Sequence, residues 1–523
     1  MTEGEGPAPV VILKPTSRVT SGAEVTGKLI AAAEALQDIM RTTYGPNGLD
    51  KMLYSTDGNA SVTNDGAKII SELMIRNPAA KTIVALASAQ EEACGDGVTT
   101  CVLFACELLR QAGPLLRQGI HPTAIGAGYG EAEAVLGSVL EQRAKPLEDD
   151  LRPVVATALT GRISSRAHHH LTDCILEALK HLDGCEASID HPAEHVLMVR
   201  RHGAEVASSE TFPGVVLEKR RRLDRMPEHL DAPRIACLTT SLQLPETERD
   251  AAFEIEDPDT LDRFMDAEDA HLDRTTRRLI ESGASVILIT GTAHDRVAHA
   301  LAEAGCLLLD GIDRPELEDL ALATGAEMIH HLDDLHPEGL GHATSAAIEL
   351  REDPEERPER LVLKGTPGPI VTIAVGGSDA TIIDETIRGL HDALRSSGQV
   401  YLDPRTLIGG ASWAAAAAHE VRTAAELQKG RARLAMLAFA HALERLPGIL
   451  AENAGRDALD AVLELRAAHR TAGSDLGIRE DGSVGAVEAA LLPFATVEHA
   501  TQSGITLAKG LLRVDQVISA RGD

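Results

Sequence analysis

The segment with the clearest chemical potential is Cys94–Thr100, Cys-Gly-Asp-Gly-Val-Thr-Thr, which opens onto an apolar helical run ending at Leu109. Glycines allow a tight turn and a close approach of the backbone to a ligand. The unpaired amides that begin the helix favour an anion such as phosphate. Because Asp96 would repel a bare phosphate, we expect a divalent cation between the two, and Mg²⁺ suits hard oxygen ligands. The motif alone leaves an ordinary Gly-Asp-Gly turn as an alternative.

Other segments bear on this interpretation. They are Tyr44-Gly45-Pro46-Asn47-Gly48, Asn64-Asp65-Gly66, Leu407-Ile408-Gly409-Gly410-Ala411, Asn77–Lys81 and Ile120–Thr123. In their order along the chain, they resemble the ATP-binding equatorial domain of the group II chaperonins, the family of archaeal thermosomes and the eukaryotic cytosolic chaperonin. The resemblance runs from Pro9–Lys14 through Leu450–Gly455 to Leu512–Asp515, which is nearly the whole chain.

The hydrophobic pattern changes along the chain. Both terminal thirds carry alanine and leucine at helical spacing, which predicts helices over 25–41, 78–93, 99–111, 121–143, 413–422, 427–446, 458–469 and 494–512. The middle carries short apolar runs between breakers, at 234–240, 285–290, 306–310 and 370–375. These runs predict an α/β domain with some parallel strands. A domain assembled from both chain ends follows from this pattern.

The resemblance implies a multidomain α and α/β chaperonin fold. In this scheme a discontinuous helical equatorial domain spans 1–143 and 397–523, an intermediate hinge domain spans 144–210 and 362–396, and an α/β apical domain spans 211–361. The stretch of about 245–283 resembles the helical protrusion of group II chaperonins, which serves as a built-in lid. Its partial apolar stripe consists of Leu261, Phe264, Met265, Leu272, Leu279 and Ile280. An ordinary surface helical hairpin is the alternative.

Two aspartates are candidate catalytic residues. In isolation, the sequence around Asp65 is typical of a common turn, whereas the resemblance matches Asp65 to a carboxylate that helps hold the attacking water. Asp392 falls opposite Leu390 on a helix, so periodicity alone predicts a solvated face. The resemblance instead matches Asp392 to the general base that a hinge helix brings to the nucleotide, and phosphoryl transfer depends chiefly on such positioning.

The resemblance also implies the remaining site residues. Nucleotide contacts are expected from Tyr44, Gly45, Pro46, Asn64, Gly95, Gly97, Val98, Thr99, Thr100, Gly161, Arg162, Gly409, Gly410, Gly477 and Gly482. Asp96 is the expected metal ligand. Arg162 stands where the family usually has a lysine that reaches toward the γ-phosphate, and it keeps the charge. Further departures from the family pattern are Asn47, Val98, Ile408, Trp413 and Leu492.

Composition limits the possible partners and compartment. The net charge of −30 argues against nucleic acid and against an anionic membrane surface. No run reaches the roughly 18 apolar residues that a membrane span needs. Seven scattered cysteines without a Cys-x-x-Cys pair suit a reducing cytoplasm. The sequence therefore predicts a soluble cytoplasmic protein.

The leading hypothesis is an ATP-dependent molecular chaperone. The resemblance implies an Mg-ATP-hydrolysing double ring of identical or related subunits that encloses and folds non-native proteins without a separate co-chaperonin lid. One alternative is a catalytically weakened ring that acts as a holdase or scaffold, which the departures at Asn47, Val98 and Leu492 would favour. A metabolic kinase has no identifiable acceptor site in the sequence.

Overall fold

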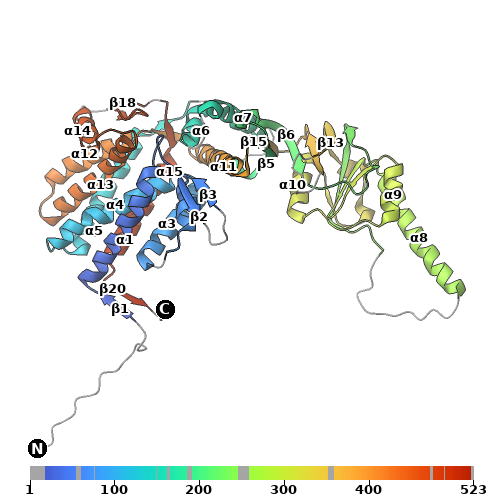
Figure 1. Ribbon diagram of the computed structural model, residues 1–523, viewed down its shortest axis with the longest axis horizontal. Coiled ribbons are helices and arrows are strands. Elements are labelled where there is room, and N and C mark those ends of the chain that lie inside the picture. Colours follow the sequence, from blue (N-terminus) through green and yellow to red (C-terminus); the bar gives the residue numbers. More distant parts are fainter. Residues whose placement is uncertain are drawn as a thin grey trace, which may run out of the picture. The chain divides into compact units, whose positions relative to one another are not determined.

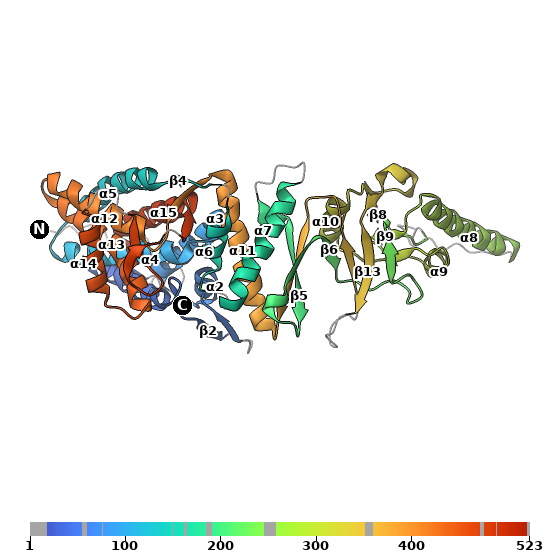
Figure 2. The same ribbon diagram turned by 90° about the horizontal axis from the view of Figure 1, so that it is seen from above.

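The computed structural model describes residues 18–54, 60–75, 77–148, 150–161, 165–184, 191–244, 258–350, 359–470, 475–487 and 489–519. The chain forms two compact units (Figures 1 and 2). Unit 1 combines Met1–Ser164 with Arg395–Asp523, and unit 2 is Ser165–Leu394. Unit 1 is therefore built from both parts of the chain that carry the helical pattern.

Unit 1 is mainly helical. Its helices are α1 (Ala23–Met40), α2 (Gly66–Glu72), α3 (Pro78–Cys94), α4 (Val98–Arg117), α5 (Pro122–Arg143), α6 (Arg152–Leu159), α12 (Ser412–Leu427), α13 (Arg431–Asn453), α14 (Ala458–Ala468) and α15 (Phe494–Leu512). Helix α11 (Ala380–Leu402) begins in unit 2 and ends in unit 1. Several helices begin at a side-chain cap: Asn77, for example, accepts hydrogen bonds from the amides of Ala79 and Ala80 and precedes a proline.

The predicted helices exist, but three of them have wrong boundaries. The helix expected over 413–422 continues to Leu427. The helix expected over 427–446 begins at Arg431, because Gly430 turns the chain at a φ of 80°, and it continues through Pro447 to Asn453. The helix expected to end at 111 likewise continues through Pro114 to Arg117. A buried helix can absorb an internal proline when packing supplies more free energy than the lost hydrogen bond.

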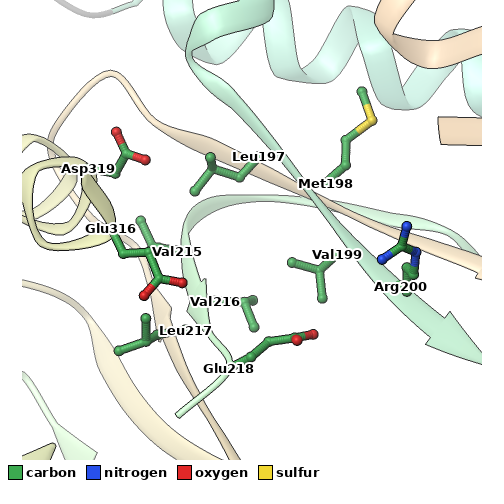
Figure 3. A pocket seen from close by; sticks show the side chains of 10 residues that line it. All are labelled: Leu197, Met198, Val199, Arg200, Val215, Val216, Leu217, Glu218, Glu316 and Asp319. Carbon is green, nitrogen blue, oxygen red and sulfur yellow. The ribbon is translucent and has the colours of Figure 1, made fainter. Parts of the chain in front are cut away.

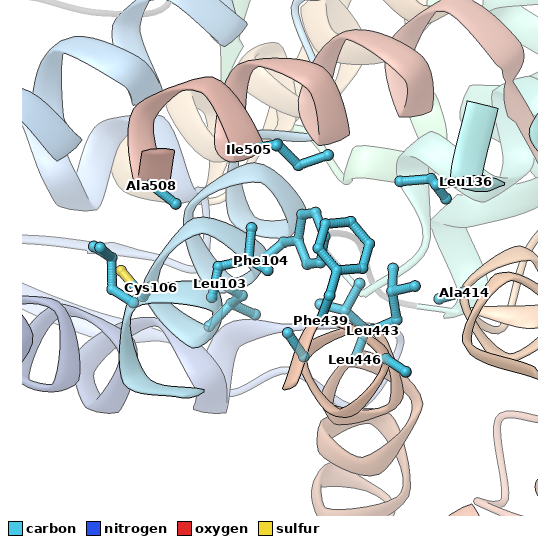
Figure 4. Packing of buried hydrophobic residues seen from close by; sticks show 14 of the residues in the cluster. Leu103, Phe104, Cys106, Leu136, Ala414, Phe439, Leu443, Leu446, Ile505 and Ala508 are labelled. Carbon is cyan, nitrogen blue, oxygen red and sulfur yellow. The ribbon is translucent and has the colours of Figure 1, made fainter. Parts of the chain in front are cut away.

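The core of unit 1 compensates for a shortage of aromatic side chains. Small and branched residues fill most of it, and the rings of Phe104 and Phe439 pack together within it (Figure 4). Phe439 packs edge-to-face against Phe104 and Tyr129, with ring centroids 5.6 and 5.7 Å apart. The Tyr129 hydroxyl donates a hydrogen bond to the Leu108 carbonyl at 2.8 Å. This packing fixes α4, which carries the Gly-Asp-Gly motif at its start, against α5 and α13.

Helix α13 is long and apolar enough to cross a membrane by length and composition alone. In the structure 78% of its most apolar stretch is buried within the protein, where its neighbours include α4, α5 and α12. This burial is typical of the core helix of a globular domain.

Small sheets complete unit 1. The antiparallel pairs are β1 (Arg18–Ser21) with β20 (Gln516–Ser519), β2 (Lys51–Tyr54) with β3 (Ala60–Thr63), and β17 (Leu476–Ile478) with β18 (Val484–Ala486). A three-stranded sheet has the order β19 (Leu491–Pro493), β16 (Arg405–Ile408), β4 (Lys145–Pro146). The first and last strands of the described part of the chain therefore pair with each other.

Unit 2 is an α/β structure with two sheets. The first has the order β10 (Leu307–Leu309), β9 (Val286–Ile289), β8 (Arg234–Leu238), β11 (Met328–Ile329), all paired in parallel, while β12 (Gly341–His342) pairs antiparallel with β8. The second has the order β5 (Val196–His202), β15 (Val371–Gly377), β6 (Glu210–Leu217), β14 (Glu359–Lys364), β13 (Ser345–Leu350), β7 (His229–Asp231). The parallel strands predicted for the middle of the chain are confirmed.

The helices of unit 2 are α7 (Ser165–Asp183), α8 (Pro258–Glu281), α9 (Asp295–Glu303) and α10 (Arg314–Thr324). The last turns of α8 pack on the unit through buried Leu272 and Leu279, whereas Met265 is 56% exposed. The exposed part of α8 extends away from the sheets of unit 2 (Figure 1). Of the predicted apolar stripe, Leu272 and Leu279 are therefore buried, whereas Met265 and Ile280, the latter 41% exposed, are not. Residues 245–257 and the side chains of Leu261 and Phe264 lie outside the described part of the chain.

A shallow pocket of about 290 Å³ lies in unit 2, between β5, β6 and α10 (Figure 3). Apolar strand residues such as Leu197 and Val215 form much of its lining, with Glu316 and Asp319 on α10. Burial and the neighbouring Glu318 and Glu316 raise the pKa of Asp319. None of the predicted site residues line this pocket.

Candidate active site

The Gly-Asp-Gly motif forms a tight connection between α3 and α4. Gly95 ends α3 at a φ of 68°, and Gly97 begins α4 at a φ of 81°. These left-handed angles are why glycine is needed at both positions. No side chain caps the start of α4, so the amides of its first turn can bind an anion. Asp96 Oδ1 lies 2.6 Å from the Gly97 amide that donates to it.

A buried glutamine side chain supports this loop by a hydrogen bond. Gln90 is fully buried, and its Nε2 donates to the Asp96 carbonyl at 2.9 Å. Its Oε1 lies 2.6 Å from Nδ1 of His499, which fixes the orientation of the amide group. A Cβ on Gly97 would come within 2.9 Å of the Thr496 methyl group. Sequence analysis missed Gln90 and His499, because a polar residue inside a helical pattern gives no sign of its distant partner.

The acidic turn at Asp65 lies against the first turn of α4. A Cβ on Gly66 would be 2.4 Å from Oγ1 of Thr99. Asp65 is only 7% exposed, and its two carboxylate oxygens accept hydrogen bonds from the amides of Ala67 and Lys68, each at 3.2 Å. Asp65 therefore caps α2. This capping role does not test the catalytic role of Asp65, which stays a prediction.

The Gly-Pro loop closes another side of the same site. Oγ1 of Thr100 donates to the Tyr44 hydroxyl at 3.4 Å, and burial raises the pKa of Tyr44. A Cβ on Gly161 would lie 3.1 Å from the Gly45 carbonyl, while Nδ2 of Asn64 donates to the Gly161 carbonyl at 2.6 Å. The Pro46 carbonyl oxygen would lie 3.4 Å from the same Cβ on Gly161. Arg162 lies outside the described residues.

Asn453 anchors the Gly-Pro loop, and sequence analysis assigned it no role. Its Nδ2 donates to the carbonyls of Arg41 and Tyr44, at 2.8 and 2.7 Å. Asn453 is the last residue of α13. The segment Leu450–Gly455, which carries part of the resemblance, thus has a structural role. It joins a helix from the second half of the chain to a loop from the first half.

The glycines from the second half of the chain form a separate cluster. The Gly409 amide donates to the Ala490 carbonyl at 2.7 Å, and the Ile478 amide donates to the Gly410 carbonyl at 2.9 Å. A Cβ on Gly477 would lie 2.8 Å from the Gly410 oxygen. Gly482 turns the β17–β18 hairpin at a φ of 77°. The structure thus brings Gly409, Gly410 and Gly477 together through backbone contacts, whereas Gly482 lies in the turn of the adjoining hairpin.

The burial of Asp392 contradicts the periodicity of its helix. Periodicity predicted a solvated face, but Asp392 is 5% exposed. The neighbouring polar residues Ser396 and Ser397 are buried as well. Apolar periodicity identifies only the buried face that is lined by apolar side chains. It therefore underestimates the buried surface of a helix that also buries hydrogen-bonded polar residues.

The comparison with known families decides the identity. The model of the TCP-1/cpn60 chaperonin family matches residues 36–522. The chain belongs to this family. A thermosome subunit of Methanopyrus kandleri is 34% identical over 537 residues, which cover all of this chain and 96% of the relative. Thermosome subunits alpha of Archaeoglobus fulgidus and Thermoplasma acidophilum are 34% and 33% identical, over 98% and 99% of this chain and 95% of each relative.

The protein is an ATP-dependent group II chaperonin, an ATPase whose hydrolysis of ATP is coupled to protein folding. It acts in an oligomeric ring that binds unfolded proteins. The family resemblance predicted from the sequence motifs is therefore confirmed, and the holdase or scaffold alternative is not favoured.

The departures from the family pattern have structural partners in this chaperonin. Nδ2 of Asn47 donates to the Glu480 carbonyl at 2.6 Å, which ties the Gly-Pro loop to the β17–β18 hairpin. Trp413 is 3% exposed in the core, and Val98 is 4% exposed. Ile408 and Leu492 lie in the paired strands β16 and β19. Asn47, Val98, Trp413 and Leu492 thus contribute side-chain contacts within unit 1, and Ile408 occupies a paired strand position.

Proposed function

We propose that the loop Gly95–Thr100 binds the phosphates of ATP and that Asp96 holds Mg²⁺ beside them. The uncapped first turn of α4 next to a carboxylate is the observation that supports this proposal most. The donor set fits, because backbone amides suit phosphate oxygens and a carboxylate suits a hard cation. Among the described residues, no group of three or more His, Cys, Asp or Glu could hold a metal ion. Bound Mg²⁺ would therefore share phosphate oxygens with Asp96 and compensate their charge.

The remaining nucleotide contacts come from two walls. The first wall is the Gly-Pro side of the site, with Tyr44, Gly45, Pro46, Asn64, Gly161 and Arg162. The second is the glycine cluster Gly409, Gly410, Gly477 and Gly482. The absence of side chains in the second wall lets the nucleotide approach the backbone closely. The link from Asn47 to the Glu480 carbonyl supports the inference that both walls belong to one site.

In the catalytic step, Asp65 orients the attacking water and Asp392 takes its proton. This proposal is supported by the place of Asp65 as the cap of α2, since the next residue, Gly66, lies against Thr99 of the phosphate loop. Asp392 belongs to the hinge helix α11 and reaches the nucleotide when the hinge closes. A base delivered by closure acts mainly on the transition state, because it is absent from the open site.

The test compares two aspartates with different tasks. Asp392→Ala should lower the catalytic constant by about 10²–10⁴-fold while ATP binding stays near the parent value, since this is the usual contribution of general-base assistance. Asp96→Ala should weaken Mg-ATP binding itself. Equilibrium ATP binding and single-turnover hydrolysis with and without Mg²⁺ measure both effects. Hydrolysis at the parent rate by Asp392→Ala would refute the general-base role.

The exposed helix α8 supports a built-in lid within an apical domain of 211–361. Met265 is 56% exposed, while ion pairs hold the helix from Asp269 onward: Arg296 Nη1 lies 2.5 Å from Asp269, and Arg278 Nη1 lies 2.6 Å from Asp333. Deletion of about 257–278 should leave ATP hydrolysis mostly intact and abolish ATP-dependent protection of an enclosed client from protease. Protection that survives the deletion would refute the lid.

Partners and compartment follow from charge and family. The net charge of −30 disfavours nucleic acid and anionic membranes, and we propose that the protein works in the cytoplasm as two stacked rings without a co-chaperonin. The equatorial parts 1–143 and 397–523 would carry most subunit contacts, with the intermediate parts 144–210 and 362–396 as hinges. Light scattering under native conditions with nucleotide should show a large oligomer, and a monomer would contradict the ring.

A further inference from the structure

The last turns of α3 are held by side chains of α11. Nη2 of Arg395 donates to the carbonyls of Glu91 and Glu92, at 2.6 and 3.0 Å. Nη1 of the same guanidinium lies 3.0 Å from the Glu91 carboxylate. One turn later, Nε2 of Gln399 donates to the Ala93 carbonyl at 3.1 Å. Two side chains on one face of α11 thus bind three successive carbonyls at the end of α3.

Arg395 also contacts the phosphate loop directly. A Cβ on Gly95 would lie 2.4 Å from Cβ of Arg395, so only glycine lets the backbone pass the arginine at this point. The Gly95 amide donates to the same Glu91 carbonyl that Arg395 binds, at 2.8 Å. The guanidinium is therefore part of the structure that ends α3 and starts the Gly-Asp-Gly turn.

Arginine is well suited to this position. The carbonyl end of a helix carries partial negative charge, which a cation stabilises. The planar guanidinium has several donors in a fixed fork, so it can bind two carbonyls and a carboxylate together. The Arg395 side chain is only 33% exposed and that of Glu91 only 31%, so water competes less for these hydrogen bonds than on an open surface.

Helix geometry relates Arg395 to the proposed base. Asp392 lies three residues before Arg395 in α11, so the two side chains leave the helix about 60° apart, separated by less than one turn. We propose that Arg395 is a positioning residue for hydrolysis: by fastening the later turns of α11 to the end of α3, it anchors the helix that brings Asp392 to the phosphate loop when the hinge closes. This inference rests on the proposed role of Asp392.

The first test is Arg395→Met, which keeps the apolar stem and removes the donors. We expect hydrolysis of bound ATP to slow by about tenfold to a hundredfold, because small displacements of catalytic groups have effects of this size. ATP affinity should change less than about threefold, because the variant retains the loop amides and Asp96. Arg395→Lys restores the charge with a single donor group and should recover part of the rate.

A matched control separates this role from general stabilisation. Arg117→Met removes an exposed arginine from the last turn of α4, away from the loop, and should keep the parent rate. Melting temperature and light scattering confirm that each variant folds and assembles. If Arg395→Met lowers the melting temperature but hydrolyses bound ATP at the parent rate, the positioning role is refuted.

A double-mutant cycle decides whether Arg395 acts through Asp392. In the Asp392→Ala background, Arg395→Met should slow single-turnover hydrolysis by less than about twofold, because there is no base left to position. If the two effects instead multiply, Arg395 acts independently of Asp392 and the inference is refuted while the general-base role stands. If Asp392→Ala alone hydrolyses at the parent rate, the general-base role is refuted, and this inference with it.

Discussion

The two glycine loops of unit 1 are built by different means. Side chains from three helices hold the loop at Gly95–Gly97, through Gln90 on α3, Arg395 on α11 and the Thr496 methyl group on α15. Backbone groups hold the loop at Gly409–Gly410, through the Ala490 carbonyl and the Ile478 amide. The first loop also has a carboxylate, and the second has none.

The two loops therefore differ in what fixes their conformation, which is side chains in the first and backbone groups in the second. A loop set by side chains can be tuned by substitution, and its position can respond to the helices that supply those side chains. A loop set by its backbone keeps its form with almost any side chain around it, provided that glycine remains at the points of contact. We therefore expect substitutions of the surrounding side chains to change ATP binding or hydrolysis at the first loop and to have little effect at the second, whereas replacement of a contact glycine in the second loop should lower stability.

The largest expected effect is at Gly97. Gly97→Ala places a Cβ 2.9 Å from the Thr496 methyl group and 3.1 Å from Gln90, at a φ of 81°. The left-handed angle alone costs about 1–2 kcal/mol, and displacement of Gln90 disturbs the loop, so ATP affinity should fall at least about tenfold. Isothermal titration measures this change. The control is Gly119→Ala, which has a φ of 78° with no atom within 4 Å of the added Cβ. Equal losses of affinity in the two variants would contradict the comparison.

The next effect tests the backbone-built loop. Gly410→Ala places a Cβ 2.5 Å from the Ile478 carbonyl oxygen at a φ of 62°. Because backbone atoms cannot turn aside as a side chain can, we expect a loss of about 1–3 kcal/mol in the free energy of unfolding. Denaturant unfolding measures it. An unchanged unfolding midpoint with lost ATP binding would show that this loop is functional in the same way as the first.

Gln90→Leu should have an intermediate effect on the first loop. The change removes the donor to the Asp96 carbonyl and leaves His499 without its partner, while it keeps the volume of the side chain. A buried polar group that loses its partner costs about 1–3 kcal/mol. We expect weaker Mg-ATP binding together with a lower melting temperature. ATP affinity equal to that of the parent would show that backbone contacts suffice for this loop too.

Val487→Ala provides the matching test of the second loop. Val487 supplies the side-chain atom nearest to Gly410, with Cγ2 3.0 Å from the position of an added Cβ. Because the hydrogen bonds of this loop are between backbone groups, we expect less than about a twofold change in ATP affinity. A change of this size is usual for a substitution that removes no specific interaction. A larger loss of affinity in calorimetry would contradict the distinction between the loops.

The smallest effect concerns the thiol before the first loop. Burial and the nearby Asp96 charge raise the pKa of Cys94 to about 11. Since the thiolate is the reactive form and the thiol stays protonated below that pH, alkylation at pH 7–8 should be very slow in the native protein. Mass spectrometry after iodoacetamide treatment measures it. Labelling should accelerate in Gly97→Ala, and fast labelling of the parent protein would show that the loop opens readily.

The sequence predicts much of this structure for physical reasons. Glycines at Gly95, Gly97 and Gly410 mark left-handed turns, because other residues are strained there. Helical periodicity locates α3, α5 and α15 closely, since each has one apolar stripe. Sequence motifs thus locate both glycine loops and the family.

Contacts between distant segments are what the sequence does not reveal. The partners of Gln90 and Asn453 lie 409 positions away, at His499 and Tyr44. Nothing in the local pattern around Arg395 marks it as a partner of Glu91, 304 residues earlier. Periodicity alone predicted a solvated Asp392 for the same reason, because the residues that cover it cannot be derived from the pattern of its own helix.

Trp413 is the single tryptophan of this chain. It is buried in the helix that follows the Gly409–Gly410 loop, within the alanine-rich core of unit 1. Selectively excited indole emission will therefore report on this unit and on none of the chain between residues 165 and 394. Loss of structure in the α/β unit alone would leave that signal unchanged, so a fluorescence melting curve of this protein measures the stability of one unit only.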